Sequence, residues 1–114
     1  MEYKNETNAI CYRLKIEPEI PLNDSKLGIA LSTLNKDPIN GLRHPVTDDA
    51  NGWYIWCGDD VSQDDEFFSP LHFEHVFEYI PEIIPYLALP PGYRFQIDRD
   101  GYEDVWFDTT LLEA

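Results

Sequence analysis

The chain has 114 residues, of which 43% are apolar and 14% aromatic, which is enough for one folded domain and excludes a mainly disordered chain. Its 22 acidic residues outweigh 8 lysines and arginines, and the net charge is −14. This balance argues against binding to nucleic-acid phosphates or to an anionic membrane surface.

The cellular compartment can be predicted from three missing features: a membrane span, a secretory signal and a disulfide framework. No apolar run approaches the roughly 20 residues that a bilayer span needs, and the N-terminus has no basic segment leading into an apolar one, so we expect no secretory signal. Two cysteines, Cys11 and Cys57, are too few for a disulfide framework and lack metal-pair spacing. A reducing, cytoplasmic location is therefore expected.

Four segments can be interpreted in the first half of the chain. Residues 9–16 alternate apolar and polar side chains, which predicts a half-buried strand. Residues 26–34 fit a strand or a helix, and their Gly and Ser-Thr pair favour the strand. Residues 35–51 are rich in Pro, Gly, Asp and Asn, which predicts a loop. Residues 53–57 are aromatic, which predicts a central strand.

A helix is predicted to begin at Ser69, because Ser69 suits the N-cap and Pro70 the first helical position. Apolar residues behind them recur at helical spacing and predict one buried stripe: Phe73, Val76, Phe77, Ile80, Ile83 and Ile84. Pro81 should break this helix near residue 80 and leave a short helical turn before Pro85.

The C-terminal third predicts a β-hairpin. Pro90-Pro91-Gly92 is a rigid turn, residues 93–97 alternate, and Asp100-Gly101 is a strong hairpin signal before a returning strand at 102–107. Together the elements predict an α+β fold in a single domain, residues 1–114. The expected architecture is a mostly antiparallel sheet of four or five strands with one main helix, about 70–80, packed on a face.

The charge is unevenly distributed along the chain. No Lys or Arg occurs between Arg43 and Arg94, whereas this interval holds ten acids, three of them spaced four residues apart on the predicted helix. Such a concentration of negative charge attracts a basic partner and speeds association. The alternative is that each acid is an ordinary solvated side chain that maintains solubility.

Known catalytic and metal-binding patterns are missing. The acids of 59–66 lack the spacing and the Gly of a calcium-binding EF-hand loop. His72, Glu74 and His75 match neither zinc-protease helix motif, and Cys57 precedes two aspartates, where a thiolate would be disfavoured. We therefore expect no enzyme activity, no metal and no cofactor.

Aromatic residues are the candidate anchors for a partner. The tryptophans are expected in the core or at its edge, although one of them could face a partner: Trp53, Trp56 and Trp106. Phe67 and Phe68 are adjacent, so an extended chain would point them to opposite sides. One should pack under the helix beginning at Ser69 and the other should contact a partner; the alternative is that both are buried.

Several runs of residues together resemble a known family. They are 41–45 (GLRHP), 52–56 (GWYIW), 58–60 (GDD), 67–72 (FFSPLH), 85–95 (PYLALPPGYRF) and 103–108 (EDVWFD). This pattern resembles immunity protein family thirty-three and its close relatives, from bacterial polymorphic-toxin systems, over roughly residues 41–112. The first 40 residues are outside the resemblance, and the matching positions look like determinants of the fold.

The resemblance implies a cytosolic antidote that binds and blocks a cognate toxin domain. The net charge predicts that this toxin is basic, for example a nuclease. The alternatives are an acidic adaptor that binds another basic protein and, less favoured, a hydrolase using the region 72–75. The candidate partner-binding residues are Asp48, Asp49, Asp59, Asp60, Asp64, Asp65, Glu66, Phe67, Phe68, Glu74 and Glu78.

Overall fold

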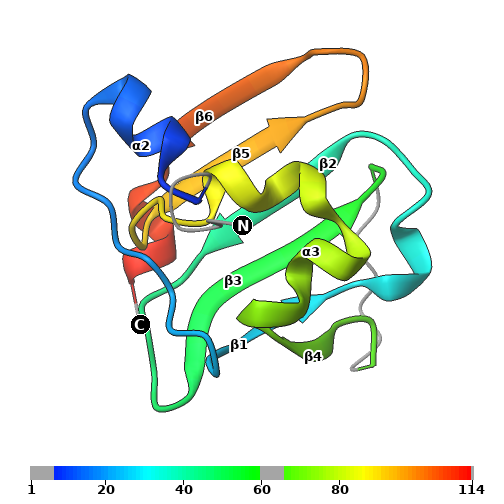
Figure 1. Cartoon of the computed structure of the whole chain (residues 1–114), viewed down its shortest axis with the longest axis horizontal. Coiled ribbons are helices and arrows are strands. Elements are labelled where there is room, and N and C mark those ends of the chain that lie inside the picture. Colours follow the sequence, from blue (N-terminus) through cyan, green and yellow to red (C-terminus); the bar gives the residue numbers. More distant parts are fainter. Residues whose placement is uncertain (1–6, 60–65, 114) are drawn as a thin grey trace.

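The computed structural model describes residues 7–59 and 66–113, and this part of the chain contains a six-stranded sheet with the strand order β4-β1-β3-β2-β5-β6 (Figure 1). The strands are β1 (Lys26–Ile29), β2 (Ile39–Arg43), β3 (Ala50–Cys57), β4 (Ser69–His72), β5 (Tyr93–Ile97) and β6 (Glu103–Phe107). β1 and β3 are parallel, and every other neighbouring pair is antiparallel. The predicted α+β class is confirmed, with more strands than the four or five expected.

The helical segments are all short. They are α2 (Ala9–Leu14), η1 (Leu31–Thr33), η2 (Phe73–His75), α3 (Val76–Tyr79), η3 (Pro81–Tyr86) and η4 (Thr109–Leu112). α3 and the segments next to it lie across one face of the sheet, and α2 packs against η3 (Figure 1).

The core lies between this helical layer and the sheet. Side chains from alternate strand positions, such as Ile29, Ile55 and Phe95, meet Ile80 and Ile83 from the helical segments, and all of them are fully buried. Alternation along a strand points the remaining side chains to the opposite face of the sheet.

The predicted strand at 9–16 is wrong, because this segment forms the helix α2. Helix α2 buries two consecutive residues, Ile10 and Cys11, whereas Tyr12, which the alternation assigned to the buried side, is 80% exposed. The helix ends where Lys15 takes a left-handed conformation. Packing against η3 therefore decides the local structure, and the two-residue period is coincidental.

The predicted loop at 35–51 is also wrong, since it contains β2, which lies between β3 and β5. Gly41 suggested a turn, but here it lets the ring of Phe95 lie directly against the strand. A Cβ at Gly41 would stand 2.3 Å from that ring. Glycine inside a strand commonly marks such a close approach.

The predicted helix start at Ser69 is wrong as well. Ser69–His72 form the edge strand β4, which pairs only with β1, and Pro70 is tolerated there because an edge strand has one side without ladder bonds. Helical structure begins at Phe73, and the predicted stripe is buried at four of its six positions, with Phe73 partly buried and Phe77 exposed.

Other predictions are confirmed. β3 covers 53–57, and β5 and β6 form the hairpin around Asp100-Gly101. Pro81 interrupts the helix at Ile80, whose φ of −151° is not helical. The ambiguous segment 26–34 divides into the strand β1 and the turn η1.

Candidate partner-binding site

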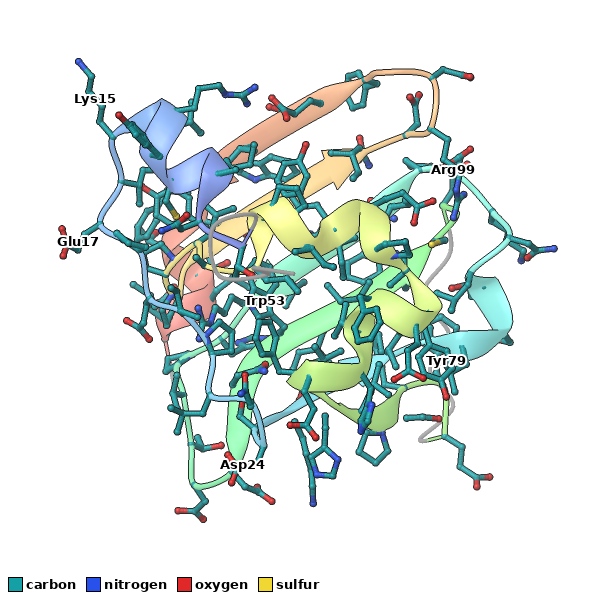
Figure 2. All side chains as sticks on the ribbon, in the orientation of Figure 1. Lys15, Glu17, Asp24, Trp53, Tyr79 and Arg99 are labelled. Atoms are coloured by element: carbon teal, nitrogen blue, oxygen red, sulfur yellow. The ribbon has the colours of Figure 1, made fainter. Side chains whose placement is uncertain are left out.

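Of the predicted acidic residues that the structure describes, all except Glu78 on α3 fall into two groups at opposite ends of β3. Asp48 and Asp49 are exposed in the turn before β3, which the Thr47–Ala50 bridge closes. Glu74 belongs to this end, because β1 joins the two segments: Lys26 pairs with both Ala50 and His72. Figure 2 shows Asp24 at this end of the molecule and Arg99 at the far end.

The second group lies where β3 ends. Asp59 is exposed just beyond β3, and Glu66 is exposed shortly before β4. These two termini are close because Ile29 of β1 pairs with both Ile55 and Ser69. Asp60, Asp64 and Asp65 lie outside the described residues, so the structure does not locate them.

Basic residues far away in the sequence pair with some acids of the cation-free interval. Lys26 Nζ lies 3.2 Å from the Asp49 carboxylate, and Arg99 Nε lies 3.1 Å from that of Glu82. The carboxylate of Glu78, on α3, lies 2.7 Å from His75 Nδ1. The acid side chains of these pairs are still 40% to 69% exposed, so a partner can reach them.

Phe67 and Phe68 are both partly buried and pack edge to face against each other, with ring centroids 4.9 Å apart. Phe68 lies beside Tyr54 at 5.2 Å and Trp56 at 6.3 Å. The expectation that one of these rings packs under a helix starting at Ser69 is wrong, because that segment is a strand. Whether either ring contacts a partner stays a prediction.

Phe68 belongs to a surface that sequence reasoning did not identify, on the sheet face opposite the core. We call it the aromatic face and define it by Leu42, Tyr54, Trp56, Phe68, Arg94 and Trp106. None of these residues belongs to the core cluster of the described chain. The available signal was β3 itself, which is aromatic or apolar on both of its faces, although the helical segments within the described residues cover only one.

The aromatic face is hollowed. A groove of about 420 Å³ is lined by five of its residues, all but Trp106, together with His44. A second groove, of about 340 Å³, runs towards Lys26 and Asp49 and shares Tyr54 and Phe68 with the first. Gly28 lines this groove, and a Cβ there would lie 2.9 Å from the Tyr54 ring, so glycine allows the ring to approach β1 closely.

Arg94 is held in place at one side of the aromatic face. Its Nη1 donates to Asp108 at 3.1 Å, and its guanidinium lies 5.5 Å from the ring centroid of Trp106. Hydrogen bonds from Thr110 and Arg94 hold the pKa of Asp108 below its usual value. Arg94 Nε is buried and has no hydrogen-bond partner among the described residues.

The three tryptophans differ in position. Trp53 is fully buried, as Figure 2 illustrates near the centre of the molecule, and its indole N–H donates to Leu87 O at 3.0 Å. Trp56 is also buried, but on the aromatic face. Trp106, on the edge strand β6, is 37% exposed and is thus the tryptophan most available to a partner.

The residues considered for catalysis or metal binding are not arranged as a site within the described ranges. No three His, Cys, Asp or Glu side chains there come together as metal ligands would. The rings of His72 and His75 are 6.2 Å apart and exposed. Burial raises the pKa of the Cys57 thiol, which favours the protonated form over a nucleophilic thiolate.

The fold and this surface define a small α+β domain with a solvent-facing sheet surface rich in aromatic residues, a composition typical of protein–protein interfaces. The model of the Imm33-like domain matches residues 6–108, so the chain belongs to this immunity-protein family. The family is generally non-enzymatic and implies a protein partner such as a toxin.

The match confirms the resemblance and extends it. The sequence runs that carried the resemblance began at residue 41, whereas the family match also includes α2, β1 and η1. No curated protein and no solved structure matches the chain. The helices found in 7–59 and 66–113 are each too short or too polar to cross a bilayer.

Proposed function

We propose that the protein is a cytoplasmic immunity protein that binds a cognate, basic toxin domain, such as a nuclease, and blocks its active site or substrate groove. The observation that carries the proposal is the Imm33-like domain over nearly the whole chain. Inhibition needs no chemistry from the antidote, because a bound domain that covers the substrate groove excludes the substrate.

The charge supports a basic toxin. A net charge of −14 creates a negative field, and the acids at both ends of β3 are exposed. A negative field raises the rate of encounter with a basic protein and is screened by salt. A nuclease domain that binds nucleic-acid phosphates carries the matching positive groove.

The proposal is tested with the toxin domain encoded by the gene immediately upstream. Co-expression of the chain should protect cells from this domain, and the purified proteins should bind. Reversing Asp59, Asp60 and Asp64 to Lys should slow association about tenfold at low salt and reduce the dependence of the association rate on salt. Stopped-flow measurements at two salt concentrations give both quantities.

A matched variant separates local steering from net charge. Glu17, Asp100 and Glu113 are exposed acids outside the 44–93 interval, and their reversal to Lys changes the net charge equally. If both triple variants slow association equally, the interval has no special role. If the wild-type chain neither protects cells nor binds, the proposed function is rejected, and an acidic adaptor for another basic protein becomes the better interpretation.

A further inference from the structure

The aromatic face contains more aromatic surface than the fold needs. The core between the sheet and the helical segments is complete without it, and none of its six residues takes part in that core. Yet Tyr54 is 39% exposed and Trp106 is 37% exposed, and the partly buried Phe68 and Leu42 lie beside Tyr54. Contiguous exposed apolar surface of this kind commonly marks an interaction site.

The composition of the aromatic face is that of an interface centre. Trp, Tyr and Arg are the residues that most often dominate the binding energy of an interface. Here Trp106 pairs with Arg94, and Arg94 is separated from Tyr54 only by Leu42 of β2. The two grooves that meet at Tyr54 and Phe68 provide the concave surface into which side chains of a partner can enter.

Two side chains of the face are held by contacts within the protein. Arg94 is held by Asp108 and by the ring of Trp106, and Tyr54 is fixed between Gly28 and Phe68. Side chains that are already ordered lose little conformational entropy when a partner binds, so their contacts contribute fully to affinity.

Charge indicates the chemistry of the occupant. Asp49, which pairs with Lys26, lines one groove, and Arg94, which pairs with Asp108, lines the other. The further carboxylates are Asp104 on β6 beside Gln96, and Asp59 and Glu66 at the end where β3 stops. The negative field of these carboxylates attracts a partner with lysines and arginines around an apolar patch, and the partner's cations are also attracted to the faces of aromatic rings.

We infer that the aromatic face is the surface that holds the toxin, with Tyr54 and Trp106 as anchors for a basic, partly apolar segment of the toxin domain. This inference rests on the proposed function and names the surface that performs it. The exposed acids then attract the toxin, and the aromatic face determines how slowly it leaves.

The inference is tested with two substitutions on the aromatic face and two elsewhere. Tyr54→Ala and Trp106→Ala should each raise the dissociation constant for the upstream toxin domain about 30-fold or more, chiefly through faster dissociation. The controls Tyr12→Ala on α2 and Tyr79→Ala on α3 remove tyrosines that are 80% and 50% exposed on the other side of the sheet. They should change the constant less than about twofold.

A photoreactive phenylalanine at either anchor position, or at Tyr12, provides a second test that does not depend on truncation. Crosslinks to the toxin should form from positions 54 and 106 and not from position 12. The inference is overturned if the anchor variants bind the toxin as tightly as the wild-type chain and only position 12 crosslinks. The proposed function would stand in that case, because the wild-type chain still binds. A dimer of the free chain that Trp106→Ala dissociates would also overturn it, because a second copy would then cover the face.

Discussion

Replacement of the buried Arg43 should clearly weaken the fold. Its side chain is almost fully buried, and it donates hydrogen bonds to three backbone carbonyls: Asn51 O at 2.8 Å, Glu19 O at 2.7 Å and Leu89 O at 2.9 Å. These acceptors come from β3, from the segment after α2 and from the segment after η3. One guanidinium therefore ties three distant parts of the chain together.

The magnitude can be worked out for Arg43→Met. Two of the carbonyls, on Asn51 and Leu89, belong to buried residues and would lose a donor that water cannot replace, at about 1–3 kcal/mol each. Part of this cost is offset, because burial disfavours the cation and lowers the pKa of Arg43 to about 10, a penalty that Met does not carry. We expect a net loss of about 2–4 kcal/mol in the free energy of unfolding.

Urea unfolding followed by tryptophan fluorescence measures this loss. With a denaturant slope of about 2 kcal/mol/M, the midpoint should fall by about 1–2 M. Arg99→Met is the matched control, because Arg99 also donates to two carbonyls, those of Lys36 and Leu34, but on the surface. Water can donate to these exposed carbonyls in place of Arg99, so Arg99→Met should lose clearly less free energy of unfolding than Arg43→Met. Equal losses in the two variants would refute the argument from burial.

Two further predictions concern stability. Gly52 and Gly101 both have positive φ, but a Cβ at Gly52 would lie 1.9 Å from His44 O whereas one at Gly101 meets nothing within 4 Å. In thermal melts Gly101→Ala should cost about 1 kcal/mol and Gly52→Ala about 3 kcal/mol or more, and equal costs would contradict the steric reasoning. Burial raises the pKa of Glu103, but hydrogen bonds from Tyr86 and Arg13 outweigh it and set that pKa below 4.5. The ionised Glu103 therefore stabilises the folded state above pH 4.5, and this contribution is lost as the pH falls through the folded-state pKa. Glu103→Gln should therefore be less stable than wild type at pH 7 and equally stable near pH 2, as chemical denaturation at both values will show; a difference independent of pH would contradict it.

The elements that the sequence predicted correctly are those with a local cause. β3 is a run of aromatic and β-branched residues, and the β5–β6 hairpin has alternation on both sides of Asp100-Gly101. Pro81 likewise has a local effect: beyond the first turn of a helix, a proline lacks the N–H that the helix needs, so the helix that contains Val76–Tyr79 is interrupted at Ile80.

The wrong predictions depended on distant contacts. Ser69-Pro70 has the local signature of a helix start, but β1 offers it an antiparallel partner, and pairing with β1 decides its structure. Gly41 looks like a turn residue until the ring of Phe95, 54 positions later, is found against it. No local pattern contains that information.

The candidate site shows the same division. The sequence places acids in the segments before and after β3, but only the strand register shows that they lie at two ends of the sheet. The aromatic face could not be predicted, because the alternation of β3 does not say which face the helical segments cover. Trp106 was considered as a partner anchor, and its exposure on the edge strand is consistent with that role without testing it.

The use of the basic residues links the fold to its proposed partner. Arg43 is buried and donates to backbone carbonyls of the core. Four further cations each form an ion pair with an acid of this chain: Arg13, Lys26, Arg94 and Arg99. These cations are engaged at short range, so a partner approaching the surface meets a field set by the excess of carboxylates. That field acts over about a Debye length and cannot fix an orientation by itself. Attraction and holding should therefore respond to different perturbations: salt and charge reversal change the association rate, whereas loss of Tyr54 or Trp106 changes the dissociation rate.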